Sequence, residues 1–182
     1  QYLFPFAAIF GGLAQFLAGM WAYRARDGLA TAMHGMWGSF WMAFGILYLL
    51  IATGVLVEPS GKFVALGFWF IVLAAITWMG ALASLAESLG LFSVLSTLAA
   101  GSTLAAIAEI GGYEGITKAA GWVFVFSAGF AWYTASAMML EGAFGRVILP
   151  TGKYSRQQNI PGSPVPERVE FSQGMPGVKV GQ

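Results

Sequence analysis

Five long apolar stretches follow one another along the chain, separated by short polar segments. They run over residues 2–23, 29–57, 63–85, 89–110 and 117–144. A helix of about 20 residues, rising about 1.5 Å per residue, crosses a hydrocarbon core of roughly 30 Å. The stretches are apolar nearly all round and lack the alternating pattern of a membrane barrel. The pattern therefore predicts an all-α integral membrane protein, a bundle of five transmembrane helices.

Polar segments end these stretches and divide the chain into two expected parts. The turn between the third and fourth stretches is very tight, at Glu87-Ser88. After Pro150 the chain carries proline, glycine, serine, glutamine and charged residues without a hydrophobic period, which is typical of a segment that is disordered by itself. We therefore expect a transmembrane helical bundle at 1–150 and a polar C-terminal tail, rich in proline and glycine, at 151–182. If ordered, this tail would lie against a neighbouring copy or a different protein.

The basic residues predict the orientation of the bundle, because cytoplasmic loops of membrane proteins carry an excess of lysine and arginine. Lys62 and Lys118 fall on one side of the predicted bundle. A larger basic set falls on the other side: Arg24, Arg26, Arg146, Lys153 and Arg156. That side, including the tail, is expected to be cytoplasmic, with Gln1 on the outer side. A preceding helix would then bring the total to six.

Composition supports the membrane assignment and excludes several kinds of site. Hydrophobic residues make up 58% of the 182 residues and charged residues only 9%, whereas soluble domains carry about 25% charged residues. Because the chain has no cysteine, it offers neither disulfides nor thiolate metal sites. The net charge of +1 gives no indication of a nucleic-acid partner.

The segment HGMWGSFW, residues 34–41, holds the one histidine of the sequence. His34 is interpreted either as a hydrogen-bonded packing residue or as a group for proton relay or pH gating, since imidazole titrates near physiological pH. A metal site is not expected, because no second histidine or carboxylate stands three or four residues after it. One histidine and no cysteine leave no catalytic triad, and no phosphate loop or dinucleotide motif is present. The sequence thus predicts neither an enzyme nor a cofactor, and favours conduction of a small solute.

Three further polar residues lie inside the apolar stretches. Glu109 and Glu141 each stand near a helix end, where they either reach interfacial water or serve proton coupling. Gln15 either hydrogen-bonds to another helix or lines a pore. Glycines recur along the predicted helices, and small residues let membrane helices approach closely, so most of them are expected at helix contacts.

Four segments of the chain, in order and spacing, resemble one family. They are FGGLAQFLAG at 10–19, GSFW at 38–41, AGW at 120–122 and FGRVILP at 144–150. They are similar to the YaaH-type acetate/succinate transporter family over about residues 1–152. The resemblance implies a homo-hexamer in the plasma (inner) membrane, in which each protomer has its own six-helix pore. It also implies movement of acetate, succinate and related monocarboxylates with protons, while some members are tied to ammonia export.

The resemblance further implies which side chains meet the substrate. Trp37 and Leu98 stand at the positions of the family's narrow point. Ala131 stands where a small residue tunes which acid passes, with Tyr133 close by. Bulky rings narrow a pore, and an apolar ring gates it by excluding water. The segment around Trp37 is therefore expected to form a constriction.

Gln15 and His34 are expected to hydrogen-bond a passing carboxylate, although the family usually has no histidine at position 34. Three other features depart from the family pattern. Neither the Asn-Pro-Ala-Pro-Leu-Gly-Leu signature nor the family's first helix is present in this sequence. Trp37 replaces the usual tyrosine, and the polar tail beyond Lys153 is longer than is common. These departures leave room for a member that does not transport acetate.

Three functions are compatible with these features. The first is a membrane channel or proton-coupled carrier for small carboxylic acids, which predicts flux of labelled acetate or succinate. The second is an accessory or structural subunit of a larger membrane assembly, joined to other membrane subunits through residues 151–182. The third is a pore for a neutral solute such as ammonia, urea or undissociated acid, because few fixed cations line the helices to hold a naked anion.

Overall fold

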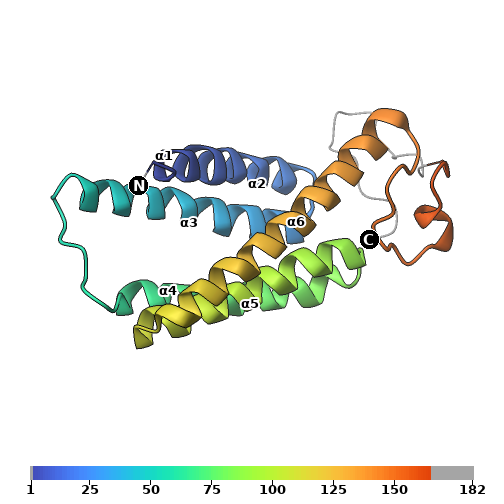
Figure 1. Cartoon of the computed structure of the whole chain (residues 1–182). Helices are drawn as coiled ribbons and strands as arrows, with labels where there is room; N and C mark the ends of the chain where they lie inside the picture. Colours follow the sequence, from blue (N-terminus) through green and yellow to red (C-terminus); the bar gives the residue numbers. More distant parts are fainter. Residues whose placement is uncertain (1, 165–182) are drawn as a thin grey trace. The chain divides into compact units, whose positions relative to one another are not determined.

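The computed structural model describes residues 2–164, and within them five helical spans are long and apolar enough to cross a membrane (Figure 1). The spans are Phe4–Arg24, Gly28–Ala52, Val64–Ser84, Leu89–Gly111 and Glu114–Phe144. The predicted all-α membrane class is therefore confirmed. The largest difference concerns the second span, which ends at Ala52 rather than at residue 57, because the chain turns at Gly54 with φ +74°.

Contacts group the described residues into two compact units, residues 2–60 and residues 61–164. The first unit is a helical hairpin. Its outgoing span consists of α1 (Phe4–Phe6), the π-helix η1 (Ala7–Ala14) and α2 (Gln15–Arg24), and α3 (Gly28–Ala52) returns beside it. Asp27 begins α3, since its Oδ1 accepts a hydrogen bond of 2.9 Å from Ala30 N. This bond satisfies one of the free N–H groups of the first helical turn.

Glycines let the two arms of this hairpin touch at backbone distance. A Cβ atom added to Gly38 would lie 2.5 Å from the backbone nitrogen of Phe16 and 2.9 Å from the carbonyl oxygen of Gly12. One added to Gly19 would lie 2.9 Å from the backbone nitrogen of Gly35. In lipid, helices associate through such close packing of small residues. The prediction that glycines stand at helix contacts is confirmed at these positions.

The second unit contains three long helices. They are α4 (Val64–Ser84), α5 (Leu89–Gly111) and α6 (Glu114–Phe144), and α5 packs against both of the others. Ser88 begins α5 by accepting a hydrogen bond of 3.2 Å from Leu91 N, in agreement with the tight turn predicted at 87–88. Gly112 ends α5 in the left-handed conformation, at φ +72°, which glycine adopts without strain.

Hydroxyl groups join these helices or bond within them. Ser127 Oγ on α6 donates a hydrogen bond of 3.0 Å to Val94 O on α5. Trp78 Nε1 on α4 donates one of 3.2 Å to Thr103 Oγ1 on α5. Other hydroxyls bond to their own helix, as Thr77 Oγ1 does to the carbonyl four residues back. Each of these bonds shields a polar group that lipid could not satisfy.

Residues 145–164 fold back onto the ends of α5 and α6. Leu89 N donates a hydrogen bond of 3.1 Å to Gly152 O, and Gly90 N donates one of 2.8 Å to Thr151 O. The first N–H groups of α5 are thereby satisfied. A short 3₁₀-helix, η2 (Arg156–Asn159), follows. The described part of the tail, residues 151–164, packs against its own chain, and residues 165–182 lie outside the described residues.

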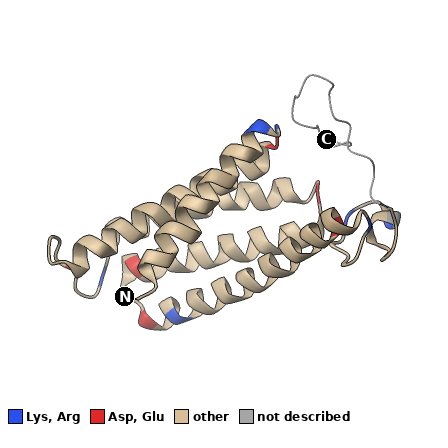
Figure 2. Ribbon diagram, turned by 90° about the horizontal axis from the view of Figure 1, so that it is seen from above, with Lys and Arg blue, Asp and Glu red and all other residues tan. Residues whose placement is uncertain are grey.

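Charged side chains lie near the ends of the spans. Figure 2 shows lysine, arginine, aspartate and glutamate at helix ends and in the connecting segments, with the helix middles free of them. A charge in the centre of a bilayer is costly. This distribution is the one expected of an integral membrane protein.

Candidate functional site

A column of aromatic rings follows α3 around the predicted constriction residue Trp37. The Trp37 ring meets Phe40 edge-on, with centroids 5.6 Å apart and planes at 81°. Phe40 in turn packs on Trp41 at 5.2 Å and on Phe44 at 5.4 Å, and Phe44 packs on Tyr48 at 4.6 Å. Trp37 and Phe40 are both 2% exposed. These contacts hold the bulky apolar surface of Trp37 in one orientation.

The two predicted hydrogen-bonding residues of this unit are His34 and Gln15. His34 lies one turn before Trp37 on α3 and is half-buried. Its Nδ1 is enclosed and has no hydrogen-bond partner within residues 2–164. Gln15, the first residue of α2, is also half-buried. An enclosed polar atom without a partner costs free energy, so a hydrogen bond to Nδ1 would stabilise this region.

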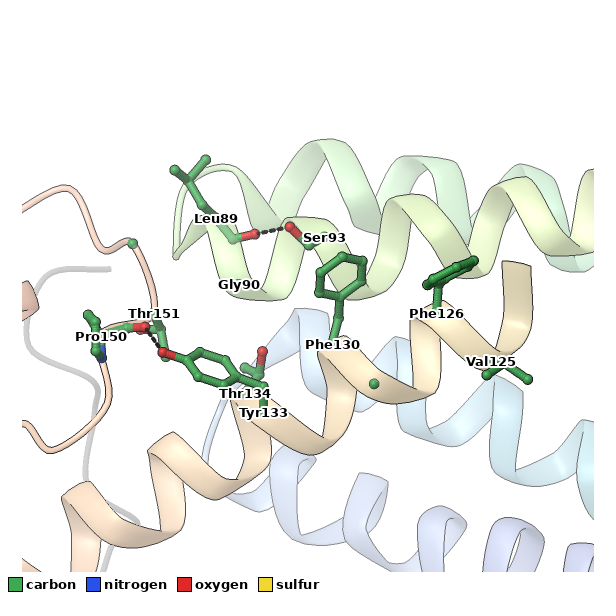
Figure 3. Close-up of a pocket in the computed structure, with 12 residues that line it drawn as sticks. Leu89, Gly90, Ser93, Val125, Phe126, Phe130, Tyr133, Thr134, Pro150 and Thr151 are labelled. Carbon is green, nitrogen blue, oxygen red and sulfur yellow. Dashed lines mark hydrogen bonds between the residues drawn. The ribbon is translucent and has the colours of Figure 1, made fainter. Parts of the chain in front are cut away.

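The second unit holds a pocket of about 580 Å³ between the start of α5, the middle of α6 and the C-terminal segment (Figure 3). Its lining residues are Leu89, Gly90, Ser93, Val125, Phe126, Gly129, Phe130, Tyr133, Thr134, Pro150, Thr151 and Gly152. None of them is charged. Gly129 leaves space in the pocket, since a Cβ atom there would meet no atom within 4 Å. A molecule in this pocket would contact rings and alkyl groups, with hydroxyls as the polar side-chain groups.

Two neighbouring residues of α6 contribute hydroxyl groups to this pocket. Tyr133 Oη donates a hydrogen bond of 2.8 Å to Pro150 O and so ties the C-terminal segment to α6. Thr134 is 6% exposed, and its Oγ1 has no hydrogen-bond partner in the described part of the chain. Gly90 makes room for this hydroxyl, because a Cβ atom there would lie 3.1 Å from Thr134 Oγ1. Thr134 was not predicted as a site residue, although it stands seven residues after Ser127 and therefore on the same helix face.

Leu98, Ala131 and Tyr133 do not form one cluster within this unit. Ala131 and Tyr133 are two residues apart on α6, so their side chains diverge by about 160°. Of the three, Tyr133 alone lines the pocket. The contacts of Gly90 and Gly101 with α6 set the register of the two helices. In that register Leu98 lies at least one turn, about 5 Å, along the helix pair from Ala131.

The chemistry available to these sites is weak hydrogen bonding combined with apolar contact. Within residues 2–164, no group of three or more histidine, aspartate or glutamate side chains could hold a metal ion. The pocket of the second unit and the aromatic column of α3 contain no lysine or arginine. Such surfaces suit a small solute that is weakly polar or uncharged.

Glu141 and Lys153 form an ion pair that the sequence did not predict. Lys153 Nζ donates hydrogen bonds of 2.8 Å to Oε1 and 3.0 Å to Oε2 of Glu141. The Lys153 and Glu141 side chains are only 27% and 15% exposed. We expected Glu141 to reach water or to serve proton coupling; instead, its carboxylate joins α6 to the C-terminal segment. Glu109, the other candidate carboxylate, remains half-buried near the end of α5.

Replacing Lys153 by methionine is expected to lower the free energy of unfolding by about 1.5–3 kcal/mol, because it leaves the largely buried Glu141 carboxylate without its partner. Denaturant unfolding in detergent measures this loss. Lys118→Met is the matched control. Its 2.8 Å ion pair with Glu114 has side chains that are 73% and 84% exposed, so a loss below about 0.5 kcal/mol is expected. Equal losses in the two variants would contradict the structural role of the Glu141–Lys153 pair.

Comparison with known proteins places this arrangement among transporters. A family model described as the GPR1/FUN34/yaaH family matches residues 1–153. The succinate-acetate/proton symporter SatP of Escherichia coli is 31% identical over 146 residues, which cover 79% of this chain and 76% of SatP. Ammonia transport outward protein 2 of Saccharomyces cerevisiae is 30% identical over 134 residues, 72% of this chain and 48% of that protein. The solved structure of the bacterial acetate channel SatP matches with a TM-score of 0.75 and 28% identity, covering 83% of this chain and 82% of that chain.

Proposed function

The chain belongs to the GPR1/FUN34/yaaH family, and we propose that it is a membrane channel or proton-coupled carrier for small carboxylic acids such as acetate and succinate. The observation that carries this function is the fold match to the bacterial acetate channel SatP, with a TM-score of 0.75. The similarity to the succinate-acetate/proton symporter of Escherichia coli supports the same substrates. The predicted family, and transport rather than enzymatic function, are thereby confirmed.

The uncharged surfaces favour passage of the protonated acid. An anion at the aromatic column or in the pocket of the second unit would lose its hydration shell. Neither lining contains a lysine or arginine that could compensate for this loss. The protonated acid avoids that cost, and it still carries one hydroxyl donor and one carbonyl acceptor. The imidazole of His34 and the amide of Gln15, both half-buried in the first unit, are the proposed partners for these groups.

Each predicted site residue has its own proposed role in the substrate path. Trp37 supplies a fixed, bulky apolar wall in the first unit, and Leu98 supplies an apolar side chain in the second. Ala131 sets the space for the acid. The Tyr133 hydroxyl is engaged by Pro150, so its part is to anchor the C-terminal segment and shape the adjoining pocket.

The assembly and orientation are proposals of the same kind. The chain is an integral membrane protein, and we propose that it lies in the plasma (inner) membrane as a homo-hexamer. The transmembrane bundle is residues 1–150, and residues 151–182 form a tail on the cytoplasmic side. The support for this orientation is the excess of basic residues after α6, at Arg146, Lys153 and Arg156.

Ammonia is a second candidate solute. The yeast relative named for outward ammonia transport supports it, and this chain spans about half of that relative's length. The uncharged lining of the pocket also suits a small neutral molecule. Ammonia transport and carboxylic-acid transport are distinguished by measuring both fluxes in the same vesicles.

Uptake of labelled succinate and acetate by the purified full chain in proteoliposomes tests the proposed function. We expect uptake above that of protein-free vesicles, which increases when the external pH is lowered because the protonated acid becomes more abundant. Unlabelled acetate should compete with succinate, and urea should not. Flux of ammonia or urea without any flux of succinate or acetate would contradict carboxylic-acid transport.

A further inference from the structure

The turn between α2 and α3 carries a basic pocket that the transport function does not use. This pocket of about 620 Å³ is lined by Tyr23, Arg24, Arg26, Gly28, Thr31 and Ala32. All of these residues belong to the first unit. Gly28 keeps the pocket open, since a Cβ atom at this position would meet no atom within 4 Å.

Hydrogen bonds fix the backbone of this turn. Arg26 N donates to Tyr23 O, and Asp27 N donates to Ala22 O, both at 3.0 Å. The Asp27 carboxylate caps α3 through Ala30 N. Arg26 itself has φ +58°, a left-handed conformation that is uncommon for residues other than glycine. The two arginines are therefore displayed by an ordered turn.

The length of the first span would bring the pocket to the depth of the lipid phosphate groups. The span Phe4–Arg24 has 21 residues, and about 20 residues at about 1.5 Å each cross the roughly 30 Å hydrocarbon core. Arg24, which ends this span, therefore reaches the headgroup layer. Trp21 and Tyr23 beside it are 68% and 73% exposed, as is typical of aromatic residues at a membrane interface.

The charge of the turn suits an anionic group with phosphate geometry. The Arg24 side chain makes no hydrogen bond or ion pair with any residue in the described range 2–164. The turn carries two arginines, Arg24 and Arg26, and one carboxylate, Asp27. Guanidinium N–H groups bond in pairs to phosphate oxygens. Below the arginines, the hairpin presents the exposed apolar side chains of Leu17 and Met20, each 43% exposed.

We propose that the pocket at the α2–α3 turn binds the phosphate of an anionic lipid headgroup. Arg24 and Arg26 contact the phosphate oxygens, Gly28 leaves space for the headgroup, and the acyl chains run along the apolar face that includes Leu17 and Met20. Inorganic phosphate and the carboxylate substrate share the anionic chemistry but have no acyl chain. The apolar face below the arginines is the feature that favours a lipid.

Native mass spectrometry of the purified full chain, with phosphatidylglycerol and phosphatidylcholine of identical acyl chains, tests this site. The wild-type chain is expected to prefer phosphatidylglycerol. Arg24→Gln should weaken phosphatidylglycerol binding about fivefold, and addition of Arg26→Gln should weaken it about fivefold again, the usual contribution of one basic residue near an anionic membrane surface. Phosphatidylcholine binding should stay unchanged, and Arg24→Lys should retain more phosphatidylglycerol binding than Arg24→Gln.

Two control variants separate this pocket from general electrostatic attraction. Arg146→Gln makes the same charge change at an exposed position after α6 and should leave the lipid preference unchanged. Gly28→Phe fills the pocket without changing its charge and should weaken phosphatidylglycerol binding as much as Arg24→Gln does. An equal loss in Arg146→Gln, or no loss in Gly28→Phe, would overturn the proposal. Displacement of phosphatidylglycerol by millimolar inorganic phosphate or acetate would also overturn it, because the site would then be one for free anions.

Discussion

Alanine in place of Gly38 is expected to lower the free energy of unfolding by about 1–3 kcal/mol, the usual cost of overpacking. The added methyl group would lie 2.5 Å from the backbone nitrogen of Phe16 and 2.8 Å from its Cα. These are backbone atoms, so the contact can be relieved only by moving α2 away from α3. Because close helix packing holds a membrane hairpin together, Gly38→Leu should prevent the hairpin from forming. Denaturant titration of the purified variants in detergent, followed by tryptophan fluorescence, measures both effects.

Gly35 provides the control for this prediction. It lies on the same helix, three residues before Gly38, but a Cβ atom at Gly35 would meet no atom within 4 Å. Gly35→Ala is expected to leave stability unchanged or to raise it by up to about 1 kcal/mol, because alanine favours the helix. A loss of stability in Gly35→Ala equal to that in Gly38→Ala would mean that helix contact does not decide the effect.

Leu98→Ala is expected to raise the ratio of succinate flux to acetate flux roughly tenfold, if Leu98 narrows the path as proposed. Removing a branched side chain from an apolar constriction admits the longer acid, and a difference of one methylene group in an apolar pocket changes discrimination by about 10–200-fold. The ratio is measured in proteoliposomes with both acids labelled in one vesicle population. It does not depend on how much folded protein the vesicles contain.

Leu104→Ala separates selectivity from a general loss of packing. Leu104 is also half-buried on α5, but it lies six residues after Leu98 and points in a direction that differs by about 120°. This variant should lose a similar amount of stability and keep the wild-type flux ratio. A flux ratio changed equally by both variants, or by neither, would remove Leu98 from the substrate path.

The spans were predictable because lipid makes hydropathy decisive: a chain inside a bilayer must pair its own backbone groups, and long apolar helices do so. The prediction was wrong at the end of α3, where Val55, Leu56 and Val57 continue the apolar pattern beyond Ala52. The helix stops there because Gly54 takes a left-handed conformation. Hydropathy measures side chains and does not report that backbone turn.

The C-terminal segment was predicted less well, because its contacts are made largely by backbone groups. Its polar composition indicated disorder, yet Thr151 and Gly152 accept hydrogen bonds from the first N–H groups of α5. Glu141 and Lys153 pair across twelve positions of sequence, at a spacing that no helical period predicts. Composition gives the residue types of a segment, whereas these hydrogen bonds depend on which helix ends lie next to the segment in the folded chain.

The sequence by itself determined the membrane class, the five spans and the family, since each depends on residue types in order along the chain. Only the tertiary structure decided which small or polar residues are in contact. Gly35 and Gly38 are the same residue type three positions apart on one helix, yet a side chain fits at the first and collides with Phe16 at the second. Likewise, Ser127 finds a partner on α5 while the Thr134 hydroxyl finds none within residues 2–164. The physical reason is that each outcome depends on the position of a neighbouring helix, which local sequence does not specify.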